Sequence, residues 1–453
     1  MINTVRYKLS HFFTSGHQRT QLAKKNVAVS LITKGGSIAI GLILIPMTID
    51  YVSPTEYGLW LTISSILGWL NFFDIGLGNG LKNRLSHDLA LGRTEEVKIL
   101  TSTTYFILLA ISLTIALLFA SLNPYIDWVH FLNVKGQSNS TIQLVMLIAV
   151  LFFCVQFVVQ LINTILTATH QTSLTSLIAF FSQLLSLILI YVCRQLVPGK
   201  LTTLVWIISG APVFIMLAWS IYLFNTRMQI FRPSFRSIQL RYTKNLLGTG
   251  ISFFFIQIGA LVLLQTNYII IARILGPEHV TLFNICYKLF SVTVLVFSII
   301  MTPIWSSSTD AYAKNDFEWL KGTLHKMRQL CILFAAATGI LLFLSPYIFR
   351  FWIGEVVTIP FALSAVMALY VISIMWYSIH IYLINGVGKI KLQLILILVS
   401  AALNVPLAIV LGKSFGLSGV VGTTTFLYAI MGIVFSVQAK KIVNRMDDGI
   451  WSK

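Results

Sequence analysis

Two lysines lie inside long apolar runs of this chain of 453 residues, and either could bind a phosphoryl group. Lys34 lies in the run 26–49, and Lys288 lies in the run 280–304. An ammonium group held among apolar helices is costly and marks a functional site by default. Its chemistry favours an anionic cargo such as phosphate or pyrophosphate. Two alternatives stay open: Lys34 could snorkel to the lipid head groups, and Lys288 could form a structural ion pair.

Amide, hydroxyl and aromatic side chains recur at helical spacing in other apolar runs. Such stripes suit sugar hydroxyls, which need paired donors and acceptors. The candidate ligands of this kind are Gln160, Asn163, Gln257, Asn284, Tyr377 and His380. Interhelical hydrogen bonds are the alternative for the amides, at about 0.6 kcal/mol each. A satisfied core histidine is the alternative for His380.

Asp74 is the one acid clearly within an apolar run, and it is followed by Gly76, Gly78 and Gly80. It is a candidate ion-coupling residue. Alternatively, it caps the next loop and pairs with Lys82 or Arg84. Lysines within the apolar runs therefore outnumber acids, which favours an anionic over a cationic cargo.

The composition demands a membrane to position these residues. The chain is 57% hydrophobic and 10% charged, with a mean hydropathy of +0.85. These values exclude a soluble enzyme, a disordered protein and a disulfide scaffold. Runs of about 20 apolar residues predict an all-α polytopic membrane protein rather than a barrel. We expect twelve spans, at 26–49, 57–80, 99–122, 142–166, 172–193, 201–224, 247–271, 280–304, 326–349, 360–384, 392–412 and 416–437.

The basic residues predict the orientation. With the N-terminus inside, 24 of the 32 Lys and Arg residues fall in cytoplasmic segments and 6 in outer loops. This bias predicts that both termini are cytoplasmic. It also explains the net charge of +18 by topology, with membrane lipids rather than nucleic acid as partners. The four cysteines form no CxxC pair, and we expect no metal, cofactor or disulfide.

A shift of 223 residues relates the two halves of the chain. It aligns Gly36 with Gly259 and Pro54 with Pro277, and it matches a helix, a Pro-bearing outer turn, a second helix and a basic inner loop. Six spans per half give two parallel lobes with a central cavity between them. The predicted parts are a tail (1–25), an N-lobe (26–224), a linker (225–246), a C-lobe (247–437) and a C-terminal tail (438–453).

Short motifs give the chain a family resemblance. The segment Phe73–Leu85, after the turn Pro54–Gly58, resembles the Wzx-type polysaccharide (O-antigen) repeat-unit flippases. So do Leu275–Pro277 and Asn385–Lys391. These flippases belong to the multidrug/oligosaccharidyl-lipid/polysaccharide (MOP) superfamily.

The resemblance implies a MATE-like fold and a non-enzymatic flippase in the bacterial inner membrane. It implies that undecaprenyl-pyrophosphate-linked glycans are moved by alternating access, with glycan polymerase and chain-length proteins as further partners. Basic residues line the cavity of such flippases, and Lys34 and Lys288 lie in suitable spans.

Two other functions remain. A drug or cation antiporter of the same superfamily would need an intramembrane acid, for which only Asp74 is available. A membrane glycan polymerase or ligase would need a large outer loop rich in Arg and His. The longest outer connection, 123–141, holds one His and one Lys.

Overall fold

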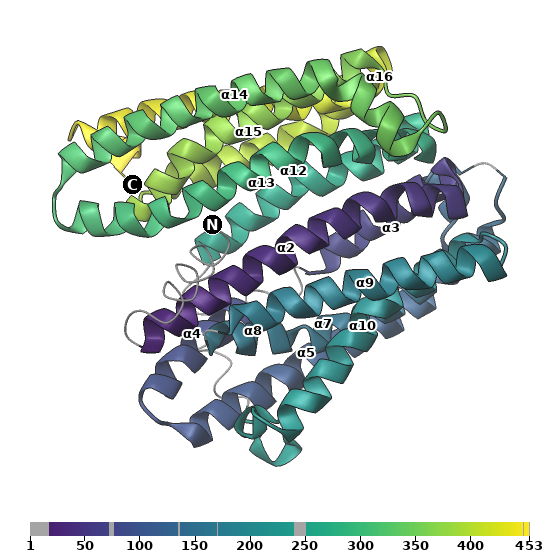
Figure 1. The fold of residues 1–453 in the computed structure, drawn as a ribbon, viewed down its shortest axis with the longest axis horizontal. Helices are drawn as coiled ribbons and strands as arrows, with labels where there is room; N and C mark the ends of the chain where they lie inside the picture. Colours follow the sequence, from purple (N-terminus) through teal and green to yellow (C-terminus); the bar gives the residue numbers. More distant parts are fainter. Residues whose placement is uncertain are drawn as a thin grey trace, which may run out of the picture. The chain divides into compact units, whose positions relative to one another are not determined.

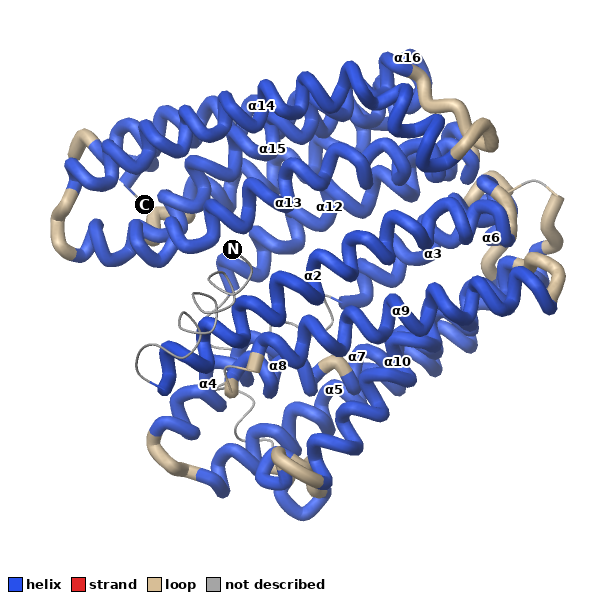
Figure 2. The backbone as a smooth tube through the Cα atoms, viewed as in Figure 1, coloured by secondary structure: helices blue, strands red, loops and turns tan. Residues whose placement is uncertain are grey.

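The computed structural model describes residues 18–71, 77–134, 136–169, 171–239, 251–446 and 448–452. Within these ranges the chain is helical and contains no strand (Figures 1 and 2). The long helices are α2 (Gln18–Tyr51), α3 (Pro54–Leu70), α4 (Leu77–Ala90), α5 (Thr94–Leu122), α7 (Asn139–Val159), α8 (Leu161–Ala168), α9 (Thr172–Leu196), α10 (Leu201–Asn225), α12 (Ile251–Leu275), α13 (Pro277–Ala313), α14 (Phe317–Ile353), α15 (Phe361–Val387) and α16 (Lys391–Val443). A short helix, α6 (Trp128–Phe131), lies between α5 and α7.

The helices account for the twelve predicted spans. Ten described stretches are long and apolar enough to cross a membrane, with α7 and α8 together forming one of them. The 17-residue α3 falls at the lower end of the spanning range, which begins at about 17 residues. The 53-residue α16 contains two spans. The prediction of an all-α polytopic membrane protein is therefore confirmed.

Gly416 separates the two spans within α16. Its φ of 62° and ψ of −145° are not helical, and a positive φ is readily adopted only by glycine. The chain reverses here, because Asn404 and Thr424 lie 20 residues apart in sequence and still form a hydrogen bond. The predicted boundary between the spans 392–412 and 416–437 coincides with this reversal.

The chain divides into two compact units. The first contains α2, α4, α5 and α7 to α10, and the second contains α3, α6 and α12 to α16. Helix α3, from the N-terminal half of the sequence, thus packs with the later helices. The sequence-based lobes and linker boundaries stay predictions.

In the first unit, α9 lies between α2 and α10 (Figure 1). Gly36 of α2 lies against the ring of Phe180 on α9, so the two helices approach closely. At the ends of these helices Arg194 and Asp50 form an ion pair of 2.6 Å.

In the second unit, α15 packs against α13, α14 and α16. Three buried polar side chains join α12 to both halves of α16. The Asn267 amide donates to Thr424 Oγ1 (2.9 Å), Thr424 Oγ1 donates to Asn404 Oδ1 (3.2 Å), and the Asn404 amide donates to Asn267 Oδ1 (3.4 Å). This closed ring shows that the polar groups of Asn267 are used between helices.

Helices α3 and α13 both begin with proline, at Pro54 and Pro277, the two positions that the 223-residue shift aligns. Proline suits a first turn, where its missing N–H would be unpaired in any case. Ser53 caps α3 by accepting a hydrogen bond from the Glu56 backbone N–H (3.1 Å). The two helix starts contact each other, because Thr281 donates a hydrogen bond to the Pro54 carbonyl.

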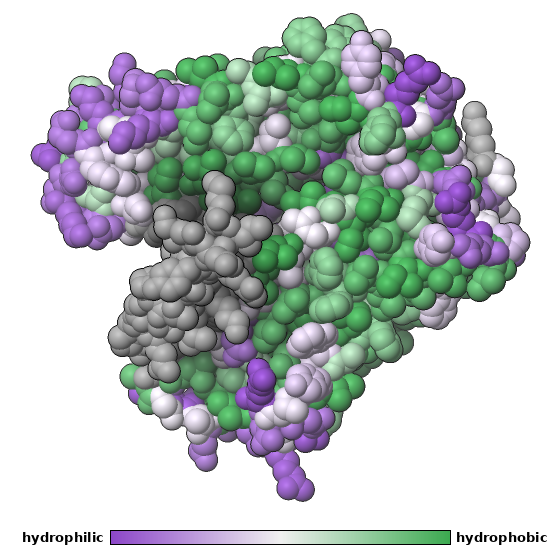
Figure 3. All heavy atoms as spheres, in the orientation of Figure 1, coloured by the Kyte–Doolittle hydropathy of each residue, from purple (hydrophilic) through white to green (hydrophobic). Residues whose placement is uncertain are grey.

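The surface has the polarity of a membrane protein. In the second unit, hydrophilic side chains gather at the turn between α13 and α14 and at the connection from α14 to α15, whereas the middles of the helices are hydrophobic (Figure 3). Large apolar side chains such as Ile340 and Phe343 are exposed on α14. Lipid rather than water is the suitable surrounding for these groups.

Substitution of Gly58 by alanine tests the packing of α3. A Cβ at Gly58 would overlap the carbonyl oxygen of Pro277, which is backbone and has little freedom to move. We expect Gly58→Ala to destabilise the protein by about 1–3 kcal/mol, the usual cost of overpacking. The measurement is thermal unfolding of purified protein in detergent. Gly339→Ala is the control, because a Cβ there would meet nothing within 4 Å, and it should leave the midpoint unchanged or slightly higher. Equal effects of the two variants would contradict the described packing.

Candidate functional site

The predicted site residues divide between the two units. Lys34, Gln160 and Asn163 belong to the first. Gln257, Asn284, Lys288, Tyr377 and His380 belong to the second. Asp74 lies outside the described residues, so its predicted role in ion coupling stays a prediction.

Lys34 is exposed on α2. Its neighbour Thr33 is buried and donates a hydrogen bond to the Val29 carbonyl (2.7 Å). A Cβ at Gly35 would meet no atom within 4 Å, so the side of α2 at Gly35 is open. Lys34 forms no ion pair with any described acid, and its role in binding an anion stays a prediction.

Gln160 and Asn163 lie where α7 gives way to α8. The Gln160 carbonyl accepts a hydrogen bond from the Asn163 backbone N–H (2.9 Å), which continues the chain into α8. Both side chains are half-buried. The buried Asn163 Oδ1 has no hydrogen-bond partner among the described residues. It is an acceptor that an incoming hydroxyl could satisfy.

Lys288 is half-buried on α13, one helical turn beyond Asn284 on the same face. The carbonyl of Lys288 accepts a hydrogen bond from Ser291 Oγ (3.0 Å), so the next polar residue of the stripe bonds to its own helix. No ion pair joins Lys288 to an acid within the described ranges. The structural ion pair considered from the sequence is therefore absent from this part of the chain.

Asn284 connects three helices. Its Oδ1 accepts a hydrogen bond from the Tyr57 hydroxyl of α3 (3.3 Å), and its amide donates to the Tyr268 hydroxyl of α12 (3.1 Å). The side chain is thus held on both sides, which fixes the turn that precedes Lys288. In this structure Asn284 supports α13 through interhelical hydrogen bonds.

A continuous series of aromatic rings runs through the second unit beside Lys288. It draws on α12, α13, α15 and α16, and five of its seven rings carry a hydroxyl. Successive centroids are 5.0 to 6.3 Å apart, in the order Tyr268, Phe283, Tyr287, Tyr370, Tyr428, Tyr377 and Phe435. These spacings are those of favourable aromatic pairs. The predicted ligand Tyr377 is a member of this series, whereas Gln257 is an exposed residue of α12 outside it.

His380 is fully buried on α15 and belongs to a cluster that contains a further cation, Arg328 of α14. One terminal nitrogen of Arg328 lies 3.3 Å from His380 Nε2 and donates to Ser436 Oγ of α16 (2.9 Å). The guanidinium also lies 5.7 Å from the centroid of the Trp376 ring, within cation–π range. The half-buried Arg328 therefore interacts with a neutral partner on each of two neighbouring helices.

The hydrogen bonds define the tautomer of His380. Its Nδ1 lies 2.8 Å from the Trp376 carbonyl, which can only accept, so Nδ1 carries the proton. Nε2 then keeps its lone pair and accepts from Arg328, which can only donate. His380 is thus a neutral ring that positions a cation.

Arg328 is one of the 24 Lys and Arg residues that the sequence assigns to cytoplasmic segments, although it lies just inside the predicted run 326–349. Two features of the sequence could have identified Arg328. It is a cation inside an apolar run, and another apolar run carries a histidine. The buried Nε of Arg328 has no hydrogen-bond partner among the described residues, so the guanidinium keeps a donor for a ligand.

The fold and these residues together define a class of protein. The chain is similar to a multidrug resistance transporter of the MATE family, of the MOP superfamily, in an inward-facing conformation. The likeness has a TM-score of 0.74 at 14% identity and covers 94% of this chain and 98% of the other. The chain is therefore a multi-pass membrane protein with the MATE fold, as the resemblance predicted.

The family follows from the sequence match. The polysaccharide biosynthesis protein family matches residues 23–308, and the chain belongs to that family. It is 22% identical over 406 residues to a protein of Yersinia pseudotuberculosis that is named for O-antigen export, with 84% of this chain and 87% of that protein covered. It is 21% identical over 383 residues to a protein of Salmonella typhimurium named for O-antigen transport, with coverage of 82% and 85%.

Truncation of His380 tests the cluster. His380→Ala leaves the half-buried Arg328 without its imidazole acceptor, and we expect a loss of about 1–3 kcal/mol of stability. His380→Gln keeps an acceptor oxygen on a shorter side chain and should lose less than half as much. Thermal unfolding in detergent measures both. Equal losses would show that the ring contributes packing alone and would contradict its role as an acceptor.

Proposed function

We propose that this protein translocates undecaprenyl-pyrophosphate-linked oligosaccharide repeat units across the bacterial inner membrane by alternating access. The proposal includes cytoplasmic termini and a role in O-antigen, capsule or exopolysaccharide assembly. Glycan polymerase and chain-length proteins are its expected partners. The observation that carries the proposal is the match to the polysaccharide biosynthesis family over residues 23–308. The relatives named for O-antigen export support it.

The chemistry of the described residues suits such a cargo. Lys34 and Lys288 supply cationic charge that no described acid neutralises, and a pyrophosphate offers several strong acceptor oxygens. Charge-assisted hydrogen bonds of this kind are about twice as strong as neutral ones. Arg328 extends the cationic set, and its planar guanidinium suits phosphate.

Two half-buried tyrosines of the aromatic series, Tyr287 and Tyr377, are the proposed contacts for the glycan. Sugar rings present apolar faces and hydroxyl edges, and Tyr residues offer a flat apolar ring with a polar tip. Tyr287, Tyr370 and Tyr428 are the central members, next in the series to Tyr377. Asn163 adds an unpaired acceptor from the first unit.

No covalent chemistry is required in this mechanism, and the relatives are named for transport and export rather than for catalysis. The protein lowers the barrier for moving a polar head group through hydrocarbon, while the polyprenyl chain stays in lipid. An inside-negative potential favours export of an anion by about 2.3 kcal/mol per charge per 100 mV.

A cation antiporter would need a carboxylate that is free to bind its cargo. Within the described ranges the fully buried acid is Asp88 of α4. It lies 3.2 Å from Arg84 and 4.0 Å from Arg93, so its charge is already matched. This pairing disfavours an antiporter built on Asp88.

Replacement of Lys288 by glutamine tests the charge assignment. We expect Lys288→Gln to lower surface glycan at least tenfold, because one charge-assisted contact is worth about 1.5–3 kcal/mol. Lys288→Arg should restore most of it. The measurement is glycan on source cells that lack the chromosomal gene and carry each variant, normalised to protein in the membrane. Lys321→Gln, which removes an exposed lysine of α14, is the matched control and should have no effect. If Lys288→Gln matched this control, the phosphate-binding role of Lys288 would be wrong.

Asp74→Asn distinguishes the two transport functions. A flippase for anionic cargo should leave ethidium efflux from expressing cells at background with or without this substitution. Efflux by the wild type that disappears in Asp74→Asn would establish the antiporter and overturn the proposal.

A further inference from the structure

The first unit contains a cavity whose lining includes none of the candidate residues above. The segment after α10 contains two short 3-10 turns, Gln229–Phe231 and Phe235–Ser237. It folds back onto α5 through two hydrogen bonds. The backbone N–H of Ser234 donates to Ser102 Oγ (3.0 Å), and that of Gln239 donates to Thr103 Oγ1 (3.0 Å).

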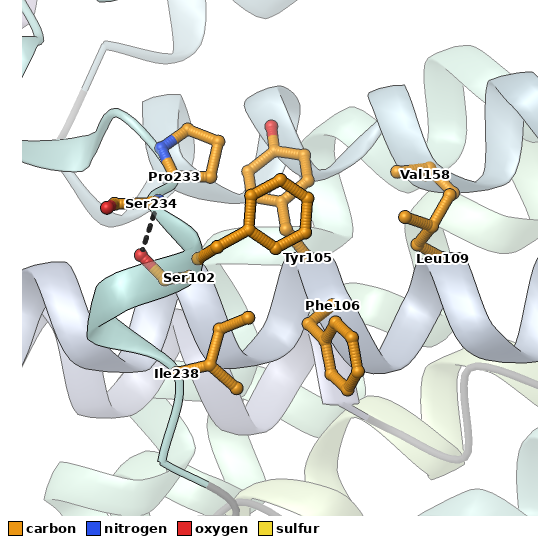
Figure 4. A pocket seen from close by; sticks show the side chains of 9 residues that line it. Ser102, Tyr105, Phe106, Leu109, Val158, Pro233, Ser234 and Ile238 are labelled. Atoms are coloured by element: carbon orange, nitrogen blue, oxygen red, sulfur yellow. Dashed lines mark hydrogen bonds between the residues drawn. The ribbon is translucent and has the colours of Figure 1, made fainter.

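The returning segment encloses an apolar cavity of about 200 Å³ against α5 and α7. Figure 4 shows Pro233, Ser234 and Ile238 of the segment beside Tyr105, Phe106 and Leu109 of α5, with Val158 of α7. Phe235 also lines the cavity and is 79% exposed. The buried Tyr105 hydroxyl has no hydrogen-bond partner among the described residues.

The cavity continues into a lipid-facing stripe. Helix α5 is the least buried of the ten candidate spans in the described chain. Phe106 and Leu109, which line the cavity, begin an exposed apolar row that continues through Leu113 and Leu117 at helical spacing. From Ser102 to Leu109 the helix rises about 10 Å, which is less than the ~15 Å of one hydrocarbon leaflet. An acyl chain could therefore lie in the cavity and along this row.

Three arginines lie in the returning segment or just before it. Arg232 and Arg236 flank the lining residues Pro233 to Phe235, and Arg227 precedes them at the end of α10. All three are exposed, and none forms an ion pair with a described acid. An apolar cavity beside uncompensated guanidinium groups matches a molecule with an acyl chain and a phosphate.

We propose that this cavity binds an anionic phospholipid, with one acyl chain between α5 and the returning segment and the phosphate at Arg232 and Arg236. On the predicted topology the lipid belongs to the cytoplasmic leaflet. Its binding holds the segment 229–239 against α5. The site is independent of the proposed transport function, because it shares no residue with the candidate cargo site.

Native mass spectrometry of the full chain in detergent tests the site. Dioleoylphosphatidylglycerol, dioleoylphosphatidylcholine and glycerol 3-phosphate are titrated separately. We expect phosphatidylglycerol to bind at least tenfold more tightly than phosphatidylcholine. Glycerol 3-phosphate should bind the wild type no more tightly than it binds a variant that lacks Arg232 and Arg236. The double variant Arg232→Gln/Arg236→Gln should abolish the preference for phosphatidylglycerol. Leu109→Trp, which fills the cavity, should weaken binding of both phospholipids.

The control is Lys321→Gln/Lys326→Gln, which removes two exposed charges from α14 and should keep the preference. An equal loss of the preference for phosphatidylglycerol in this control would overturn the site, because any surface charge would then attract the lipid. Tight binding of glycerol 3-phosphate alone would reassign the arginines to free phosphate. Displacement of phosphatidylglycerol by equimolar undecaprenyl phosphate would overturn the choice of lipid. The arginine variants concern exposed residues, so their result stands even if Leu109→Trp fails to fold.

Discussion

A cation among apolar helices needs a compensating partner, and the other interactions of the molecule depend on which charges have one. Two matched examples are Asp88, which lies between two arginines, and Arg194, which pairs with Asp50. Lys34 and Lys288 have no such acid. Their desolvation therefore has to be relieved by water, by lipid head groups or by a ligand that brings negative charge. A phosphoryl group is a ligand that would supply this charge to either lysine.

Several polar groups of the described second unit hold its helices together. Asn267, Asn404 and Thr424 form a closed ring of hydrogen bonds, and Asn284 is held by two tyrosines. His380 accepts from Arg328, whose buried Nε has no hydrogen-bond partner among the described residues. Among the candidate residues of the described second unit, the group without an acid partner is the ammonium of Lys288. A sugar phosphate offers the acceptors that this group recognises.

The apolar runs predicted the helices well, because a bilayer of fixed thickness demands about 20 residues for each crossing. Even the reversal at Gly416 fell at a predicted boundary, since glycine alone adopts its backbone conformation readily. The grouping of α3 with the later helices was not predicted. It depends on the absence of a side chain at Gly58, which lets α3 lie against the backbone of Pro277, and no periodicity reports such a contact.

Arg328 was missed because charge counting treats a cation near the end of a run as a loop residue. The return of the segment 229–239 depends on two hydroxyls of α5 that read in the sequence as ordinary helix residues.

We propose that Lys34 and Lys288 recognise the phosphoryl groups of the carrier. The most direct measurement compares the affinity of purified protein for one oligosaccharide carried on undecaprenyl pyrophosphate and on the uncharged polyprenyl alcohol. We predict that the wild type prefers the pyrophosphate by at least tenfold, that added salt reduces the preference, and that Lys34→Gln/Lys288→Gln abolishes it. A preference of unchanged size in the double variant would contradict the account.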